Sequence, residues 1–106
     1  MATDLELAVV MGIFEARTGR EEPLAAILAK YVVLTRRRPG CRNVDLVASV
    51  LNRGRFVVVE KWESAAVQRE HLDAPETVEM AEAARELLAR APDLDLYEPI
   101  SAQDLE

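Results

Sequence analysis

The sequence contains few of the residues that several protein classes require. Cys41 is the only cysteine, which excludes an intrachain disulfide and argues against a metal cluster held by thiolates. A single thiol is typical of proteins from a reducing compartment, so we predict a cytoplasmic location. Every apolar run is far shorter than the roughly 20 residues of a membrane helix. The start of the chain, MATDLE, lacks the basic region of a secretory signal, and no membrane association is expected.

Basic residues are in the minority. The chain has 13 Lys and Arg against 19 Asp and Glu, which gives a formal net charge of -6 at pH 7. Nucleic-acid binding without sequence preference needs a basic face, so no nucleic-acid partner is expected. Three adjacent arginines, Arg36, Arg37 and Arg38, are a local exception. We interpret them as cations at the negative end of a helix dipole, with an anion-binding site as the alternative.

The remaining composition is that of one globular domain. Half of the 106 residues are hydrophobic and 30% are charged. A chain of this size buries roughly two thirds of its unfolded surface, which is enough for folding without disulfides or metals. We predict a single domain over residues 1–106, with the core in residues 7–100 and a polar C-terminal tail in residues 101–106.

Hydrophobic periodicity predicts an alternation of strands and helices. Strands are predicted at residues 7–14, 44–50, 55–62 and 94–97. Helices are predicted from residue 21 to about 36–38, from Ser64 to a break at Ala74-Pro75, and from about 77 to 91. In the last helix, the positions expected to face inward are Val78, Ala81, Ala84 and Leu88. The order β-α-β-β-α-β is that of a ferredoxin-like α+β fold, with a four-stranded antiparallel sheet and helices on one face.

Two of the predicted strands are apolar on both faces. The segments LAVVMGIF (7–14) and FVVV (56–59) do not alternate with polar residues, as a half-exposed strand would. The helices can cover only one face of the sheet, and large exposed apolar patches are rare on monomers. We therefore predict a homodimer in which the second sheet face meets the same face of another subunit. Gly12, inside the first strand, predicts a bulge or a close approach by another group.

An ordered set of motifs accompanies this pattern. The set consists of GREEPL (19–24), RPGC (38–41), RFVVVEKWES (55–64), HLDAP (71–75) and LYEPI (96–100). With this spacing it resembles the antibiotic-biosynthesis-monooxygenase family over nearly the whole chain. The resemblance implies a dimeric α+β barrel, with a pocket between the sheet and the helices of each subunit. It also implies oxidation of quinols, anthrones or other electron-rich aromatics by dioxygen, with no metal and no organic cofactor.

Such chemistry needs a base, hydrogen-bond donors and an apolar cavity. His71 is the only histidine, and we consider it either the base of this site or a structural residue bonded within the fold. The side chains predicted to line the pocket are Trp62, Phe56, Tyr31, Tyr97 and Glu60. Trp62 is alternatively a core aromatic. For Glu60 we expect pairing with an Arg or Lys rather than catalysis, because a buried carboxylate needs a partner.

At several positions this sequence departs from the residue patterns of related proteins, and these departures restrict the possible functions. The resemblance places Gly12, His71 and Met80 where haem-degrading relatives carry Asn, Trp and His, which argues against haem degradation. Glu76 follows Pro75 where the monooxygenase pattern often has a second histidine. Two further hypotheses stay open: a non-catalytic dimer that binds a small hydrophobic ligand, and an isomerase on the same fold.

Overall fold

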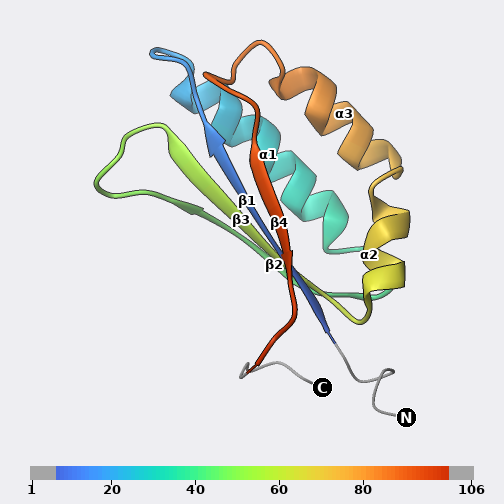
Figure 1. Ribbon diagram of the computed structural model, residues 1–106. Helices are drawn as coiled ribbons and strands as arrows, with labels where there is room; N and C mark the ends of the chain where they lie inside the picture. Colours follow the sequence, from blue (N-terminus) through green and yellow to red (C-terminus); the bar gives the residue numbers. More distant parts are fainter. Residues whose placement is uncertain (1–6, 101–106) are drawn as a thin grey trace.

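The computed structural model describes residues 7–100 (Figure 1), so the tail predicted at 101–106 lies outside the described residues. The elements are β1 (Ala8–Glu15), α1 (Glu21–Thr35), β2 (Cys41–Ala48), β3 (Arg55–Trp62), α2 (Ala65–His71), α3 (Pro75–Ala84) and β4 (Asp93–Tyr97). Among these residues, the structure contains no helix with the length and apolar character needed to cross a membrane.

The strands form one antiparallel sheet in the order β2-β3-β1-β4. The helices lie on one face of this sheet, with α1 and α3 side by side (Figure 1). Strands β1 and β3 occupy the centre, which agrees with their nearly continuous apolar sequences. The architecture confirms the predicted ferredoxin-like α+β fold, with its second helical region divided into α2 and α3.

Short-range signals set several element boundaries. The Ser64 hydroxyl accepts a hydrogen bond from the Val67 amide at 3.2 Å and so caps α2. Gly40 has a φ of +85° in the turn between α1 and β2, a conformation that favours glycine. A Cβ at Gly40 would also lie 2.5 Å from Val67 Cγ1, so this turn packs closely against α2.

The structure corrects both predicted ends of the second strand and of the last helix. Strand β2 begins at Cys41 and ends at Ala48, and Val50 lies beyond it with 95% of its surface exposed. Helix α3 begins at Pro75, where proline is tolerated because the first turn needs no amide donor. It ends at Ala84, far short of residue 91, because the following segment turns toward β1 and forms an isolated bridge between Ala16 and Leu88.

The predicted inward face of the third helix was also partly wrong. Ala84 and Leu88 are buried, whereas Val78 is 46% exposed and Ala81 is exposed. The face of α3 that meets the core instead carries Met80 and Ala84, and Leu88 follows in the segment after the helix.

The three arginines lie at the C-cap of α1 and just beyond it, and two of them form specific contacts with neighbouring elements. Helix α1 ends at Thr35, and no basic residue lies in its last turn. Arg36 instead donates two hydrogen bonds to the Val44 carbonyl of β2, at 3.0 and 2.9 Å. Arg38 turns toward α3 and pairs with Glu76. These contacts tie the C-terminal end of α1 to its neighbours.

The two faces of the sheet differ in coverage. Under the helices, Phe14, Val44, Phe56 and Val58 pack with α1 residues in the buried core. The opposite face carries apolar side chains that remain partly or largely exposed, at Val9, Met11, Ile13, Val47, Val57 and Val59. We call these six residues the outer apolar face.

Candidate functional site

A cavity of about 520 Å³ lies between the helix-covered face of the sheet and the region from α2 to β4. Its lining is mainly apolar and includes Val10, Phe14, Val58, Met80, Leu88 and Leu94. Gly12 belongs to the floor of this cavity, since a Cβ there would lie 2.8 Å from Leu94 Cδ2. Strand β1 shows no register shift at Gly12, so the predicted close approach, rather than a bulge, accounts for this glycine.

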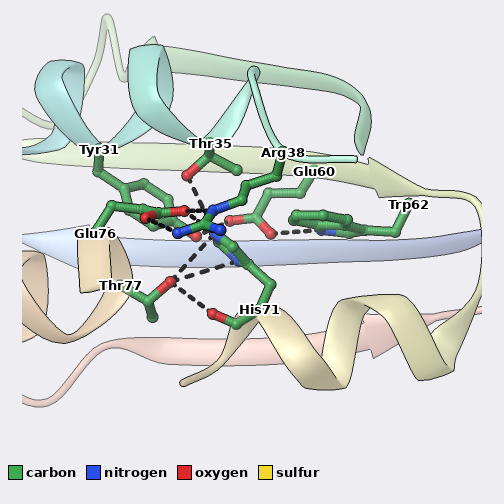
Figure 2. Close-up of polar contacts among 8 residues, drawn as sticks. All are labelled: Tyr31, Thr35, Arg38, Glu60, Trp62, His71, Glu76 and Thr77. Atoms are coloured by element: carbon green, nitrogen blue, oxygen red, sulfur yellow. Dashed lines mark hydrogen bonds and ion pairs between the residues drawn. The ribbon is translucent and has the colours of Figure 1, made fainter. Parts of the chain in front are cut away.

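At the α2 end of the cavity, polar side chains gather around His71 (Figure 2). We call this group the histidine cluster; its members are Tyr31, Thr35, Arg38, Glu60, Trp62, His71, Glu76 and Thr77. They come from α1 and the turn after it, from β3, from the end of α2 and from the start of α3. Residues far apart in sequence thus meet at one end of one cavity.

Glu60 is a buried carboxylate held by two neutral donors. The Tyr31 hydroxyl donates to Glu60 Oε2 at 2.5 Å, and Trp62 Nε1 donates to Glu60 Oε1 at 2.8 Å. Glu60 is only 5% exposed. The predicted partner, an Arg or Lys, is therefore wrong, because α1 and β3 supply an aromatic hydroxyl and an indole instead. These two bonds satisfy a group whose burial would otherwise be costly.

His71 ends α2 and points into the cluster (Figure 2). Its imidazole stacks in a tilted arrangement on Trp62, with ring centroids 4.6 Å apart, and lies 5.7 Å from the Tyr31 ring. The Nε2 atom is 3.2 Å from the Thr77 hydroxyl, 3.4 Å from the Thr35 hydroxyl and 3.3 Å from a Glu76 oxygen. Packing and polar contacts together fix the position of the ring.

Burial and charge act in opposite directions on His71. Burial lowers the pKa of the imidazole below its ordinary value of 6.5, while the carboxylates of Glu60 and Glu76 raise it less strongly. The ring is therefore neutral at pH 7. Burial also raises the pKa of the Tyr31 hydroxyl far above its ordinary value, and the adjacent Glu60 carboxylate adds to this effect. Tyr31 consequently stays protonated and donates to Glu60.

Glu76 and Arg38 form a bidentate ion pair beside His71. Arg38 Nε and Nη2 lie 2.5 and 2.7 Å from the two Glu76 oxygens. The hydrogen bonds from Arg38 lower the pKa of Glu76 from 4.5 to about 2. The Glu76 side chain is 7% exposed, so a carboxylate stands at the position where the family pattern often has histidine. This pair links the turn after α1 to the first turn of α3.

The structure brings together some of the predicted site residues and separates others. Tyr31, Glu60 and His71 line the cavity. Trp62 and Phe56 are buried in the core and are absent from the described cavity lining. Tyr97, on β4, is 45% exposed and borders a separate groove near Leu7 and Ser64.

Sequence reasoning missed four members of the cluster as site residues. Thr35 and Thr77, whose hydroxyls contact His71, carry no recognisable motif. Arg38 and Glu76 were both noticed, but for other reasons, and no signal in the sequence connected them. Among residues 7–100, no group of three or more His, Cys, Asp or Glu side chains is arranged to hold a metal ion.

Cys41 lies outside this cluster, at the start of β2. Burial raises the pKa of its thiol, and the charge of Glu60 adds to the effect. A protonated, partly buried thiol is a weak nucleophile. This environment is that of a small packing residue rather than of a reactive thiol.

Comparison with known proteins places this arrangement in a family. Residues 7–88 match the profile of the antibiotic biosynthesis monooxygenase family. The structure of Rv0793 from Mycobacterium tuberculosis matches with a TM-score of 0.85 at 27% identity, over 92% of this chain and 98% of that one. Protein SO0527 from Shewanella oneidensis matches with a TM-score of 0.83 at 26% identity, over 90% and 92% of the two chains.

A relative known from its sequence is more distant. The uncharacterized protein sll1783 of Synechocystis is 24% identical over 97 residues, which make up 92% of this chain. The chain spans 66% of the length of that relative, just under two thirds. The family match, by contrast, covers most of the chain and contains the whole histidine cluster. On this basis the chain belongs to the antibiotic biosynthesis monooxygenase family.

Proposed function

We propose that the protein is a cofactor-independent monooxygenase that oxidises a small electron-rich aromatic or quinol with dioxygen. The observation that carries this proposal is a neutral, buried histidine at one end of a largely apolar cavity of about 520 Å³. Membership of the family supports monooxygenase-type chemistry. The cavity is within the size range that accommodates small organic ligands.

In this proposal His71 is the general base. Burial keeps its imidazole neutral, so a nitrogen lone pair is available for the proton of a phenol or an activated methylene. The imidazolium that forms would face Glu60 and Glu76, and both carboxylates favour the protonated ring. The apolar lining keeps water from the deprotonated substrate, which strengthens its interactions with the site.

The electrons for oxygen reduction come from the substrate itself. The deprotonated aromatic transfers an electron to dioxygen, and the two resulting radicals combine. For an anthrone, the methylene becomes a carbonyl, and the second oxygen atom leaves as water with the two hydrogens of the methylene. No external reductant is required. The Gln68 amide lines the cavity and supplies a donor for the oxygen adduct in this scheme.

The test is oxygen consumption with an anthrone such as dithranol, measured above the rate of autoxidation without protein. His71→Ala should lower turnover by roughly 10²–10⁴-fold, the usual contribution of a general base. Arg69→Gln, on the exposed side of the same helix, is the matched control and should leave turnover unchanged. Equal activity of the wild type and His71→Ala would exclude His71 as the base.

A non-catalytic ligand-binding protein is the second candidate. Among the described residues, no buried side-chain nitrogen or oxygen lacks a hydrogen-bond partner, so the fold alone satisfies the histidine cluster. This observation favours a structural role for His71 and a cavity that only binds. If hydroquinones and anthrones bind in the cavity but none is turned over, the binding function replaces the oxygenase.

We also propose that the protein is a homodimer in which two outer apolar faces meet. Met11 on the central strand β1 is 37% exposed and Val47 on the edge strand β2 is 52% exposed, and both belong to the outer apolar face. A specific interface on this face should bury well over ~1,000 Å² in total. Family membership supports this assembly.

Sedimentation equilibrium at micromolar concentration tests the dimer. Val57 lies between Ile13 of β1 and Val47 of β2, at the centre of the outer apolar face. Val57→Lys should convert the dimer to a species of about 11.8 kDa. Val33→Lys, at a 47% exposed position of α1, is the control and should remain dimeric. A wild-type protein that sediments as a monomer would exclude the assembly.

A further inference from the structure

The cavity has a second polar end, away from the histidine cluster. Arg17, Arg85 and Arg90 all line it, and we call them the arginine rim. Arg17 follows β1, Arg85 caps the C-terminal end of α3, and Arg90 lies in the segment that leads to β4. In Figure 1 this segment is at the opposite end of α3 from α2, and therefore from His71.

Backbone contacts hold the arginine rim in place. The Arg17 amide donates to the Leu87 carbonyl at 2.8 Å, and the Ala89 amide donates to the Glu15 carbonyl at 2.7 Å. The Arg17 side chain adds a bond from Nε to the Leu88 carbonyl at 2.9 Å. These bonds fix the segment after α3 against the end of β1, with guanidinium groups from both sides beside the cavity.

The charge of the rim is only partly neutralised. Arg90 pairs with Glu15 at 3.0 Å, but the same carboxylate also binds Arg55 at 2.9 Å. Within residues 7–100, the Arg85 guanidinium has no ion-pair partner. Glu60 is the only carboxylate among the described residues of the lining, and it lies at the other end. A chain of net charge -6 therefore presents a cationic opening to an apolar cavity.

The two polar ends are well separated along β1. Glu60 is opposite Val10 in the sheet register, whereas Arg17 comes seven residues later. At ~3.3 Å per residue, the part of β1 between Val10 and its end at Glu15 extends roughly 17 Å, and Arg17 lies beyond that end. The cavity thus has room between its ends for more than one aromatic ring, on a floor that includes Gly12 and Phe14.

We propose that the ligand is an extended aromatic hydroxy acid. Its ring system would lie on the apolar floor, its hydroxyl at the histidine cluster and its anionic group at the arginine rim, where guanidinium groups bind carboxylates well. This inference rests on the proposed function at one point, because it takes the ligand to be the substrate of the proposed oxidation. Anion selection itself requires no turnover.

Two fluorescent probes with the same ring skeleton test anion selection. 8-Anilinonaphthalene-1-sulfonate carries an anionic group, and N-phenyl-1-naphthylamine lacks it. The sulfonate should bind about tenfold more tightly, and Arg85→Gln should weaken it by about three- to tenfold, as expected for a charge-assisted hydrogen bond at a partly exposed site. Binding of the neutral probe should change less than about twofold. Arg85 forms no ion pair within residues 7–100, so its replacement should not disturb folding.

Two controls locate the effect. Arg42→Gln removes the same charge from an exposed position of β2 outside the lining and should leave both affinities unchanged. Ala81→Phe places a ring within the lining and should weaken the binding of both probes. This result would show that the probes bind in the cavity and not on the outer apolar face. Raising the salt from about 0.05 M to about 0.5 M should weaken the sulfonate alone.

The outcomes separate this inference from the proposed function. Equal binding of the two probes, or a sulfonate affinity that Arg85→Gln does not change, would overturn anion selection even if anthrones were oxidised. Selective sulfonate binding that depends on Arg85 would support the inference even if no aromatic were oxidised. If Ala81→Phe changes the affinity of neither probe, the probes bind outside the cavity, and this result would also overturn the inference.

Discussion

The two ends of the cavity use polar residues in different ways. In the histidine cluster the fold itself supplies a partner for each polar side chain, as with Glu60 and its two donors. At the arginine rim the guanidinium groups are exposed, and Arg85 has no ion-pair partner within residues 7–100. Buried polar groups must be satisfied by the protein, whereas exposed ones are solvated and can exchange water for a ligand. Substitutions in the histidine cluster should therefore affect both the stability of the fold and the reaction, whereas substitutions in the arginine rim should affect ligand binding alone.

Truncation of Trp62 should show the largest difference in stability between the two ends of the cavity. Trp62 is fully buried, contacts the His71 ring and donates to Glu60. Trp62→Ala should lower the free energy of unfolding by about 3–5 kcal/mol, the usual cost of removing a large core aromatic. Arg85→Ala should stay within about 0.5 kcal/mol of the wild type. Urea unfolding at one fixed protein concentration measures both, and a similar loss for the two variants would contradict the distinction between the ends.

A gentler change isolates the hydrogen bond of the indole. Trp62→Phe keeps an aromatic ring in the core but removes the donor to Glu60 Oε1. We expect a loss of about 1–3 kcal/mol, because a buried carboxylate then lacks one partner. This variant should remain folded, so its stability can be compared with that of Arg85→Ala if Trp62→Ala cannot be purified.

Acid should destabilise the histidine cluster through Glu76. Its pKa is about 2 in the folded protein and 4.5 ordinarily, so its contribution is complete above pH 4.5 and is lost as the pH falls toward 2. The contribution is about 1–2 kcal/mol once the 40% exposure of the Arg38 side chain is considered. Unfolding free energies measured from pH 6 to pH 3 should therefore fall less in Glu76→Gln than in the wild type. Parallel curves for the two proteins would contradict this prediction.

The sequence was informative where periodicity and local signals decide the structure. The sheet, the cap at Ser64 and the close approach at Gly12 followed from such patterns. The ion pair between Arg38 and Glu76 could not be predicted, because 38 residues separate the partners and only the packing of α1 against α3 brings them together. The same limit applies to Glu60, whose partners could not be identified as Tyr31 and Trp62 before the register was known.

Prediction of the third helix failed for a related reason. Its apolar periodicity continues through Leu88, but the segment leaves the helix after Ala84 to bond with the end of β1. Tertiary hydrogen bonds from Arg17 and Ala89 thus outweigh the local helical preference. The arginine rim is a product of this departure, which explains why no helical pattern could reveal it.

Charges near His71 should shift the pH dependence of turnover in opposite directions. Burial lowers the pKa of His71, so the acid limb of kcat/KM should lie below pH 6.5 if this ring is the base. Glu76 raises that pKa and Arg38 lowers it. Glu76→Gln should therefore move the acid limb to lower pH, and Arg38→Gln should move it to higher pH. Dithranol oxidation measured from pH 4.5 to pH 8 gives both shifts. A limb that does not move in either variant would assign it to another group.

The smallest expected effect concerns the floor between the two ends. A Cβ at Gly12 would lie 2.8 Å from Leu94 Cδ2 and 3.0 Å from Phe14 Cε1. Leu94 is 60% exposed and can move aside, whereas Phe14 is buried and cannot move as freely. Alanine also reduces the freedom of the unfolded chain, which stabilises the folded state by about 0.4–1 kcal/mol and partly offsets the crowding.

Gly12→Ala should therefore change the free energy of unfolding by less than about 1 kcal/mol. Its methyl group narrows the floor on which the ring system would lie, so both fluorescent probes should bind about two- to fivefold more weakly, as for a small steric change in an apolar pocket. The loss should be equal for the sulfonate and the neutral probe, because Gly12 lies between the charged ends and belongs to neither. A loss confined to the sulfonate would mean that the floor and the arginine rim are not independent parts of the site.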